Sequence, residues 1–139
     1  MLILDTNHYS VLEGGGPACW RLKARLESSD DWRAVSVITE AEVLKGRLAQ
    51  IQRARQPDRG IEAYSFLQDS VTHLNSWLIL PWTEQAADIY DSLKHLHSKV
   101  GTMDLRIAAI ALSIDATVLT RNLVDFTKVP GLKVENWLD

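Results

Sequence analysis

The chain opens with Met1-Leu2-Ile3-Leu4-Asp5-Thr6-Asn7, in which a short apolar run leads directly into an aspartate. The run Met1–Leu4 has the pattern of a buried strand, so Asp5 is expected at the carboxyl end of that strand. Asp5 or Asn7 could also cap a following helix, because both residue types favour that position. In a parallel α/β sheet, ligands bind beyond the carboxyl ends of the strands. This first stretch therefore indicates where a site would form.

The remaining sequence alternates between strand-like and helix-like segments. Strands are predicted over Trp32–Ile38, Trp77–Leu80 and Thr117–Leu119, and residues 129–134 supply a turn and a fifth strand. Helices are predicted over Pro17–Glu27, from Thr39 onward, over Ile61–Leu74 after a turn at 56–60, over Thr83–His97 and over Thr102–Ile114. This alternation favours an α/β fold with a mostly parallel central sheet of four to five strands flanked by helices. No repeat or linker divides residues 1–139, so one domain is expected.

Size and composition are those of an ordinary globular protein. Of the 139 residues, 46% are hydrophobic and 24% are charged, which argues against disorder. The net charge of −3 argues against general electrostatic capture of nucleic acid, although a local basic patch could still serve that end. Cys19 is the only cysteine, and no apolar run is long enough to span a bilayer. We therefore expect a protein of the reducing cytoplasm that is not bound to a membrane.

Three further acidic residues occupy positions like that of the first aspartate: Glu42, Asp104 and Asp125. Each has an ordinary structural explanation. Glu42 could complete a capping box with Thr39, Asp104 could complement a helix dipole, and Asp125 could be a plain surface carboxylate. Carboxylates gathered at one edge of a sheet would repel one another, and a hard cation such as Mg²⁺ or Mn²⁺ relieves that repulsion.

Several neighbours of these carboxylates could assist them. Asn122 lies on the same helical side as Asp125, and its amide could bind a metal ion, hold a water or cap a short helix. The hydroxyls of Thr6 and Thr120 could orient the carboxylates, or each could simply cap a turn. His8 is close in sequence to the first aspartate and could contact a substrate.

Taken in order, these motifs resemble those of PIN-domain ribonucleases of the VapC toxin type. The matching segments are Leu2–Asn7, Val35–Gly46, Asp104–Ala111, and a closing segment of Thr120–Phe126 with Val129–Leu132. The resemblance extends from Met1 to about Trp137. Any one motif is weak, whereas the set in register is fairly specific.

The resemblance implies a PIN-like fold and Mg²⁺- or Mn²⁺-dependent endonucleolytic cleavage of RNA. It assigns metal binding and catalysis to Asp5, Glu42 and Asp104. Many relatives carry an acidic residue where this chain has Asn122, so Asp125 is the best candidate for the fourth carboxylate, with Asn122 as a neutral helper. The ions would activate a water to attack the phosphorus and would neutralise charge on the leaving oxygen. An RNA substrate, a cognate antitoxin and a second copy of the chain in a homodimer are the partners that the resemblance implies.

Two alternative functions stay open at this point. A catalytically silent PIN-fold module would bind RNA or a partner, although a silent site has no need of a costly charge cluster. A phosphotransfer enzyme of the haloacid-dehalogenase type would use Asp5 as its nucleophile. That family has a second aspartate where this chain has Asn7, and no lysine closely follows the fourth predicted strand.

Overall fold

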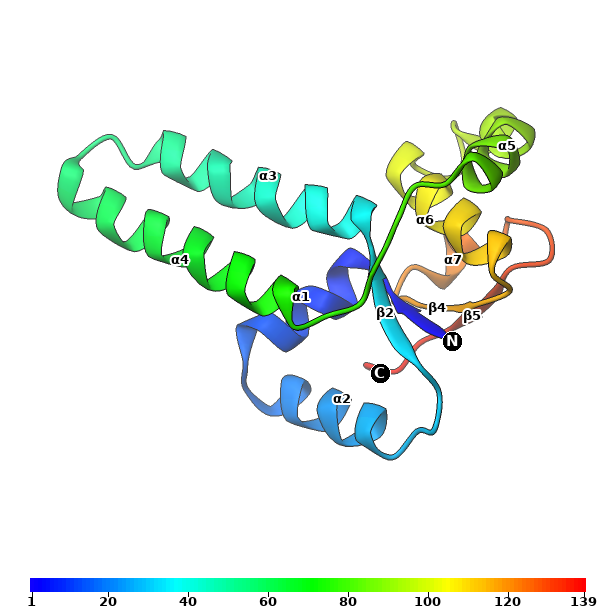
Figure 1. Cartoon of the computed structure of the whole chain (residues 1–139), viewed down its shortest axis with the longest axis horizontal. Coiled ribbons are helices and arrows are strands. Elements are labelled where there is room, and N and C mark those ends of the chain that lie inside the picture. Colours follow the sequence, from blue (N-terminus) through cyan, green and yellow to red (C-terminus); the bar gives the residue numbers. More distant parts are fainter.

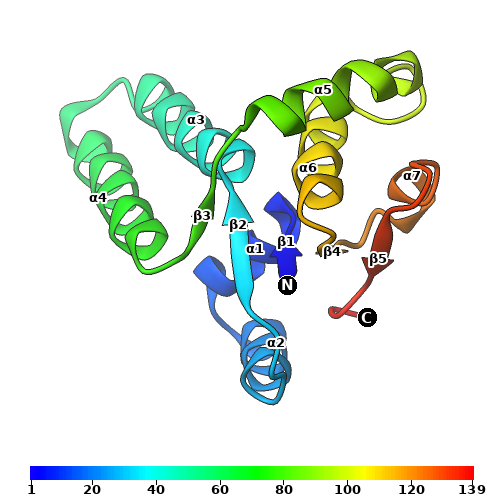
Figure 2. The same cartoon turned by 45° about the vertical axis from the view of Figure 1, so that its right-hand side comes forward.

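Strand β1, Leu2–Leu4, is the central strand of a five-stranded sheet in the order β3-β2-β1-β4-β5. The computed structural model describes all residues 1–139, and every strand pair in it is parallel (Figures 1 and 2). The other strands are β2 (Arg33–Ser36), β3 (Ile79–Leu80), β4 (Thr117–Leu119) and β5 (Lys133–Glu135). The predicted α/β class and mostly parallel sheet are therefore confirmed.

Seven α-helices and one short 3₁₀ helix surround this sheet: α1 (Thr6–Gly14), α2 (Pro17–Glu27), α3 (Val37–Arg53), α4 (Pro57–Asn75), α5 (Glu84–Leu93), η1 (Lys94–Leu96), α6 (Thr102–Ser113) and α7 (Leu123–Phe126). Helices α3 and α4 pack against each other as a long hairpin that projects from the sheet (Figure 1). Helices α5 and α6 pack together, away from this hairpin (Figure 2). No helix is long and apolar enough to cross a membrane.

The sheet separates two hydrophobic clusters, because successive side chains of a strand point to opposite faces. Ile3 belongs to one cluster with α5, α6 and Val118. Leu2 and Leu4 belong to the other, with residues of α1 and α2. Burial on both faces explains why the first strand is uninterruptedly apolar. It also holds the carboxyl end of β1, and hence Asp5, in a fixed place between the two layers.

The structure adds one helix and corrects three boundaries. Helix α1 was not predicted as such; it begins directly after Asp5 and ends in the glycine run. Strand β2 ends at Ser36, which caps α3, so α3 begins at Val37 and not at Thr39. The predicted turn at 56–60 is the first turn of α4, where Pro57 lacks only an N–H that needs no partner. Helix α5 ends at Leu93, and η1 completes the segment predicted to reach His97.

Candidate active site

Asp5 follows β1 and is only 4% exposed. Its Oδ1 accepts a hydrogen bond of 2.8 Å from the backbone N–H of His8, so Asp5 is the N-cap of α1. The backbone N–H of Asp5 donates to Leu119 O at 3.0 Å, which ties the residue to the end of β4. The capping explanation is thus correct for one carboxylate oxygen, and it leaves Oδ2 available for a ligand.

Glu42 does not cap a helix. It is the sixth residue of α3, and the cap is Ser36, whose hydroxyl accepts from the N–H of Thr39 at 3.2 Å. The predicted capping box of Thr39 and Glu42 is therefore wrong. Glu42 Oε1 instead accepts a 2.8 Å hydrogen bond from the hydroxyl of Thr6, the residue after Asp5. This contact brings the glutamate of α3 to the carboxyl end of β1.

Asp104 lies in the first turn of α6 and is partly buried. Burial raises the pKa of its carboxyl group, and the negative charges of Asp5, Glu42 and Asp125 raise it further. A 3.3 Å hydrogen bond from Asn122 Nδ2 opposes the shift. The mutual influence of these charges indicates that the four predicted carboxylates share one region of the molecule.

Asp125 and Asn122 form the outer part of this region. Asn122 is at the start of α7 but makes no side-chain cap. Its Nδ2 donates to Asp104 and, at 2.9 Å, to Asp125 Oδ2. The hydrogen bond from Asn122 lowers the pKa of Asp125, and so does Lys128, whose Nζ is 3.2 Å from Oδ1. In this arrangement Asn122 offers its nitrogen, and not its amide oxygen, to the carboxylates.

The two threonines differ in what they touch. Thr6 donates to Glu42 and lies 3.2 Å from the hydroxyl of Thr39. Thr120 is fully buried, and its hydroxyl accepts the backbone N–H of Asn122 at 2.9 Å without contacting a carboxylate. Thr6 can therefore orient a carboxylate directly, whereas Thr120 fixes only the turn that carries Asn122.

His8 was expected to be able to contact a substrate, and the structure contradicts this. The side chain is 0% exposed. Its Nδ1 is 3.5 Å from Asp5 Oδ1, and its Nε2 accepts from the N–H of Trp137 at 3.3 Å. Sequence reasoning missed this partner because Trp137 is 129 residues away.

The donor chemistry of the site suits a hard divalent cation, which prefers carboxylate oxygens. No group of three or more His, Cys, Asp or Glu side chains is arranged closely enough to hold an ion as it stands. The two observations agree, because charges influence one another over longer distances than a metal–ligand bond spans. The residues fit a metal ion by type and location.

A cavity of about 630 Å³ lies elsewhere. It is lined by Trp32 and Arg33 at the start of β2, together with Trp77, and it contains none of the four acidic residues. Because the ligand edge of a parallel sheet is the carboxyl edge, chemistry is a better guide here than cavity size.

Comparison with known proteins agrees with the fold and the motif order. Residues 2–132 match the model of the PIN domain, and the chain therefore belongs to the PIN-domain family. It is 29% identical over 135 residues to Ribonuclease VapC1 of Haemophilus influenzae (strain R2866), covering 97% of this chain and 96% of that protein. The predicted resemblance to VapC-type members is thereby confirmed.

Two solved structures share the fold closely. One is VapBC2 from Rickettsia felis bound to a DNA fragment from its promoter, with 25% identity, a TM-score of 0.73 and coverage of 98% of both chains. The other is VapBC-1 from nontypeable Haemophilus influenzae, with 24% identity, a TM-score of 0.78 and coverage of 99% and 98%. The second supports the fold alone.

Proposed function

We propose that the protein is a metal-dependent endoribonuclease of the VapC toxin type, which hydrolyses phosphodiester bonds in RNA. The observation that carries this proposal is the proximity of Asp5, Glu42 and Asp104. Thr6, the neighbour of Asp5, donates to Glu42, and the charges of Asp5 and Glu42 add to burial in raising the pKa of Asp104. These three carboxylates come from three different helices, and bringing their charges together is costly. A purely structural role would not require that cost. Membership of the PIN family and the similarity to a ribonuclease support the reaction class.

In this proposal Asp5, Glu42 and Asp104 hold Mg²⁺ or Mn²⁺, and Asp125 completes the site. A bound ion would lower the pKa of a water and neutralise charge on the phosphate. The hydroxyl of Thr6 holds Glu42 in place, and the N–H of His8 holds Asp5. The amide of Asn122 joins Asp104 to Asp125 and partly offsets their charge repulsion, so it assists the site without being a ligand.

The partners proposed for this protein follow the same family. A cognate antitoxin is supported by the structural similarity to VapBC2, and a homodimer is a family expectation. We place the protein in the cytoplasm, in keeping with its single, buried and free Cys19.

The test is cleavage of RNA by the purified chain with Mg²⁺ or Mn²⁺, with and without chelator, beside Asp5→Asn and Asp104→Asn. The proposal requires cleavage that depends on metal and that both variants abolish while they stay folded. Equal cleavage by wild type and variants would refute it. RNA binding without cleavage would favour a silent module, and hydrolysis of small phosphate esters alone would favour a phosphotransfer enzyme.

A further inference from the structure

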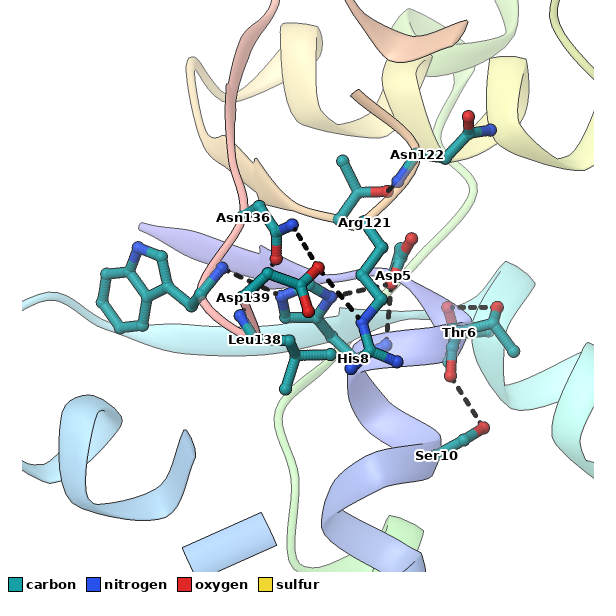
Figure 3. A network of polar contacts seen from close by, with 12 residues as sticks. Asp5, Thr6, His8, Ser10, Arg121, Asn122, Asn136, Leu138 and Asp139 are labelled. Carbon is teal, nitrogen blue, oxygen red and sulfur yellow. Dashed lines mark hydrogen bonds and ion pairs between the residues drawn. The ribbon is translucent and has the colours of Figure 1, made fainter. Parts of the chain in front are cut away.

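The C-terminal segment, residues 136–139, folds back beside the end of β1 (Figure 3). Three contacts hold it there. Trp137 N–H donates to His8 Nε2 at 3.3 Å, Arg121 Nε lies 3.5 Å from Asp139 Oδ2, and Arg25 stacks over the Trp137 ring at 4.5 Å. Asn136 braces the segment internally through hydrogen bonds to Leu138 and Asp139. The segment thus reaches the buried histidine next to Asp5.

One ring nitrogen of His8 is buried without a hydrogen-bond partner. It is Nδ1, and Asp5 Oδ1 lies 3.5 Å from it. The same oxygen already accepts the backbone N–H of His8 at 2.8 Å. Buried polar atoms are nearly always partnered, so an exception beside a candidate ligand calls for a reason.

The contact with Trp137 determines where the imidazole carries its proton. A backbone N–H can only donate, so Nε2 must present a lone pair to it. A neutral imidazole with an unprotonated Nε2 carries its hydrogen on Nδ1. That N–H then lies beside Asp5 Oδ1. The 3.5 Å separation is long for a hydrogen bond, so the attraction is mainly that of a dipole for a carboxylate.

We propose that His8 is a positioning residue for Asp5, and that the backbone N–H of Trp137 selects the tautomer that makes it one. A single hydrogen bond leaves a carboxylate free to turn and exchange its oxygens. The backbone N–H of His8 donates to Oδ1, and the dipole of the ring N–H attracts the same oxygen from 3.5 Å, so Oδ2 is kept available for a cation. The inference rests on the proposed function, because it takes Asp5 to be a metal ligand.

Metal ligands are commonly oriented by neighbouring groups that do not themselves bind the metal, and His8 stands in that relation to Asp5. Here the orientation of Asp5 depends on a peptide group 129 residues further along the chain. Loss of that N–H should weaken metal binding about 10-fold or more, the effect typical of losing such an orienting group.

The decisive variants are Trp137→Pro, which removes the N–H, and Trp137→Ala, which keeps the N–H and removes the indole. The ring nitrogens of His8 are observed by ¹⁵N NMR in the metal-free protein, and Mn²⁺ affinity is measured by electron paramagnetic resonance of the free ion. We expect the Nδ1–H tautomer in wild type and Trp137→Ala. In Trp137→Pro we expect that tautomer to be lost, with Mn²⁺ binding weakened about 10-fold.

A second pair of variants tests the ring itself. His8→Asn keeps a donor near the position of Nδ1 and should retain most Mn²⁺ affinity, whereas the flat, apolar ring of His8→Phe should not. Circular dichroism and Tm establish that each variant is folded. If His8→Phe fails to fold, the Trp137 pair still decides the matter.

Two results would overturn the inference: an Nε2–H tautomer in the wild type, or unchanged Mn²⁺ affinity in folded Trp137→Pro. Asp5→Asn separates this failure from that of the proposed function. If Asp5→Asn abolishes Mn²⁺ binding while Trp137→Pro does not, only the positioning role is wrong. If Asp5→Asn binds Mn²⁺ as tightly as wild type, Asp5 is not a ligand and the proposed function itself falls.

Discussion

The candidate site has two sides that hold their carboxylates differently. On the side of α1 and α3, Asp5 and Glu42 each accept a 2.8 Å hydrogen bond, from His8 N–H and from the Thr6 hydroxyl. On the side of α6 and α7, Asp104 and Asp125 share the one amide of Asn122. The first pair has separate supports, whereas the second pair shares one amide, with Lys128 as an additional partner of Asp125 alone.

The electrostatic difference follows from this arrangement. The pKa of Asp104 is raised by burial and by the other carboxylates, whereas the pKa of Asp125 is lowered by Asn122 and Lys128. The charge of Asp104 is therefore disfavoured, mainly by burial, whereas the charge of Asp125 already has partners. A cation would relieve more unfavourable energy at Asp104 than at Asp125, so the fourth position is the weaker of these two.

The largest effect is expected from removing the charge of Asp5 or of Asp104, one from each side of the site. Asp5→Asn and Asp104→Asn should each reduce RNA cleavage about 1000-fold or more, since a metal ion supplies several kcal/mol of charge stabilisation. Rates are compared under single-turnover conditions with Mn²⁺. Asn retains the shape of each side chain and can still cap α1, so folding is not the cause. Cleavage within 10-fold of wild type in either variant would remove that residue from the ligand set.

The support of Glu42 gives the next largest effect. Thr6→Val removes the hydroxyl at nearly constant volume and should weaken Mn²⁺ binding about 10- to 100-fold. Thr6→Ser keeps the donor and should stay close to wild type. Thr120→Val is the matched comparison on the other side, because its hydroxyl reaches only the backbone of Asn122. Equal losses in Thr6→Val and Thr120→Val would mean that the two sides do not differ.

The fourth position should matter less. Asp125→Ala is expected to lower cleavage about 10-fold, a loss of about 1.4 kcal/mol in transition-state stabilisation. Asn122→Ala should cost at least as much, because it releases Asp104 as well as Asp125. Single-turnover cleavage rates of Asp125→Ala and Asn122→Ala show which of the two side chains contributes more. Full activity in Asp125→Ala would exclude it as a ligand, and would leave three carboxylates with Asn122 as their helper.

Sequence patterns predicted the parts of this site that depend on local order. The apolar run of β1 and the register of the PIN-like motifs placed Asp5 and Asp104 without the structure. The alternative explanation of Glu42 as a capping residue is wrong, because Ser36, buried at the end of β2, caps the helix three residues earlier than Thr39 would. Neither the pairing of His8 with Trp137 nor the direction of the Asn122 amide could be predicted, since both depend on tertiary packing.

The raised pKa of Asp104 makes a prediction about stability in chelator. Folding favours the protonated form, so the folded protein loses stability as the pH rises above the ordinary value of 3.8 and through the higher folded pKa. Below 3.8 the group is protonated in both states. Asp104→Asn should therefore raise Tm by a few degrees at neutral pH and by nothing at pH 3. Thermal unfolding at both pH values measures this, and a lower Tm at neutral pH would show that the charge is stabilising.

The smallest effect is expected at Lys128. Its ammonium group neutralises Asp125 but is well exposed, and exposed ion pairs contribute little. Lys128→Ala should change cleavage by less than about threefold at moderate salt, because Asn122 still holds Asp125. Lys128→Ala in the Asn122→Ala background should cost more than Lys128→Ala alone, since Asp125 then has neither partner. If Lys128→Ala lowers cleavage equally in both backgrounds, Lys128 and Asn122 act independently. The hydrogen bonds on the side of α6 and α7 would then not act together.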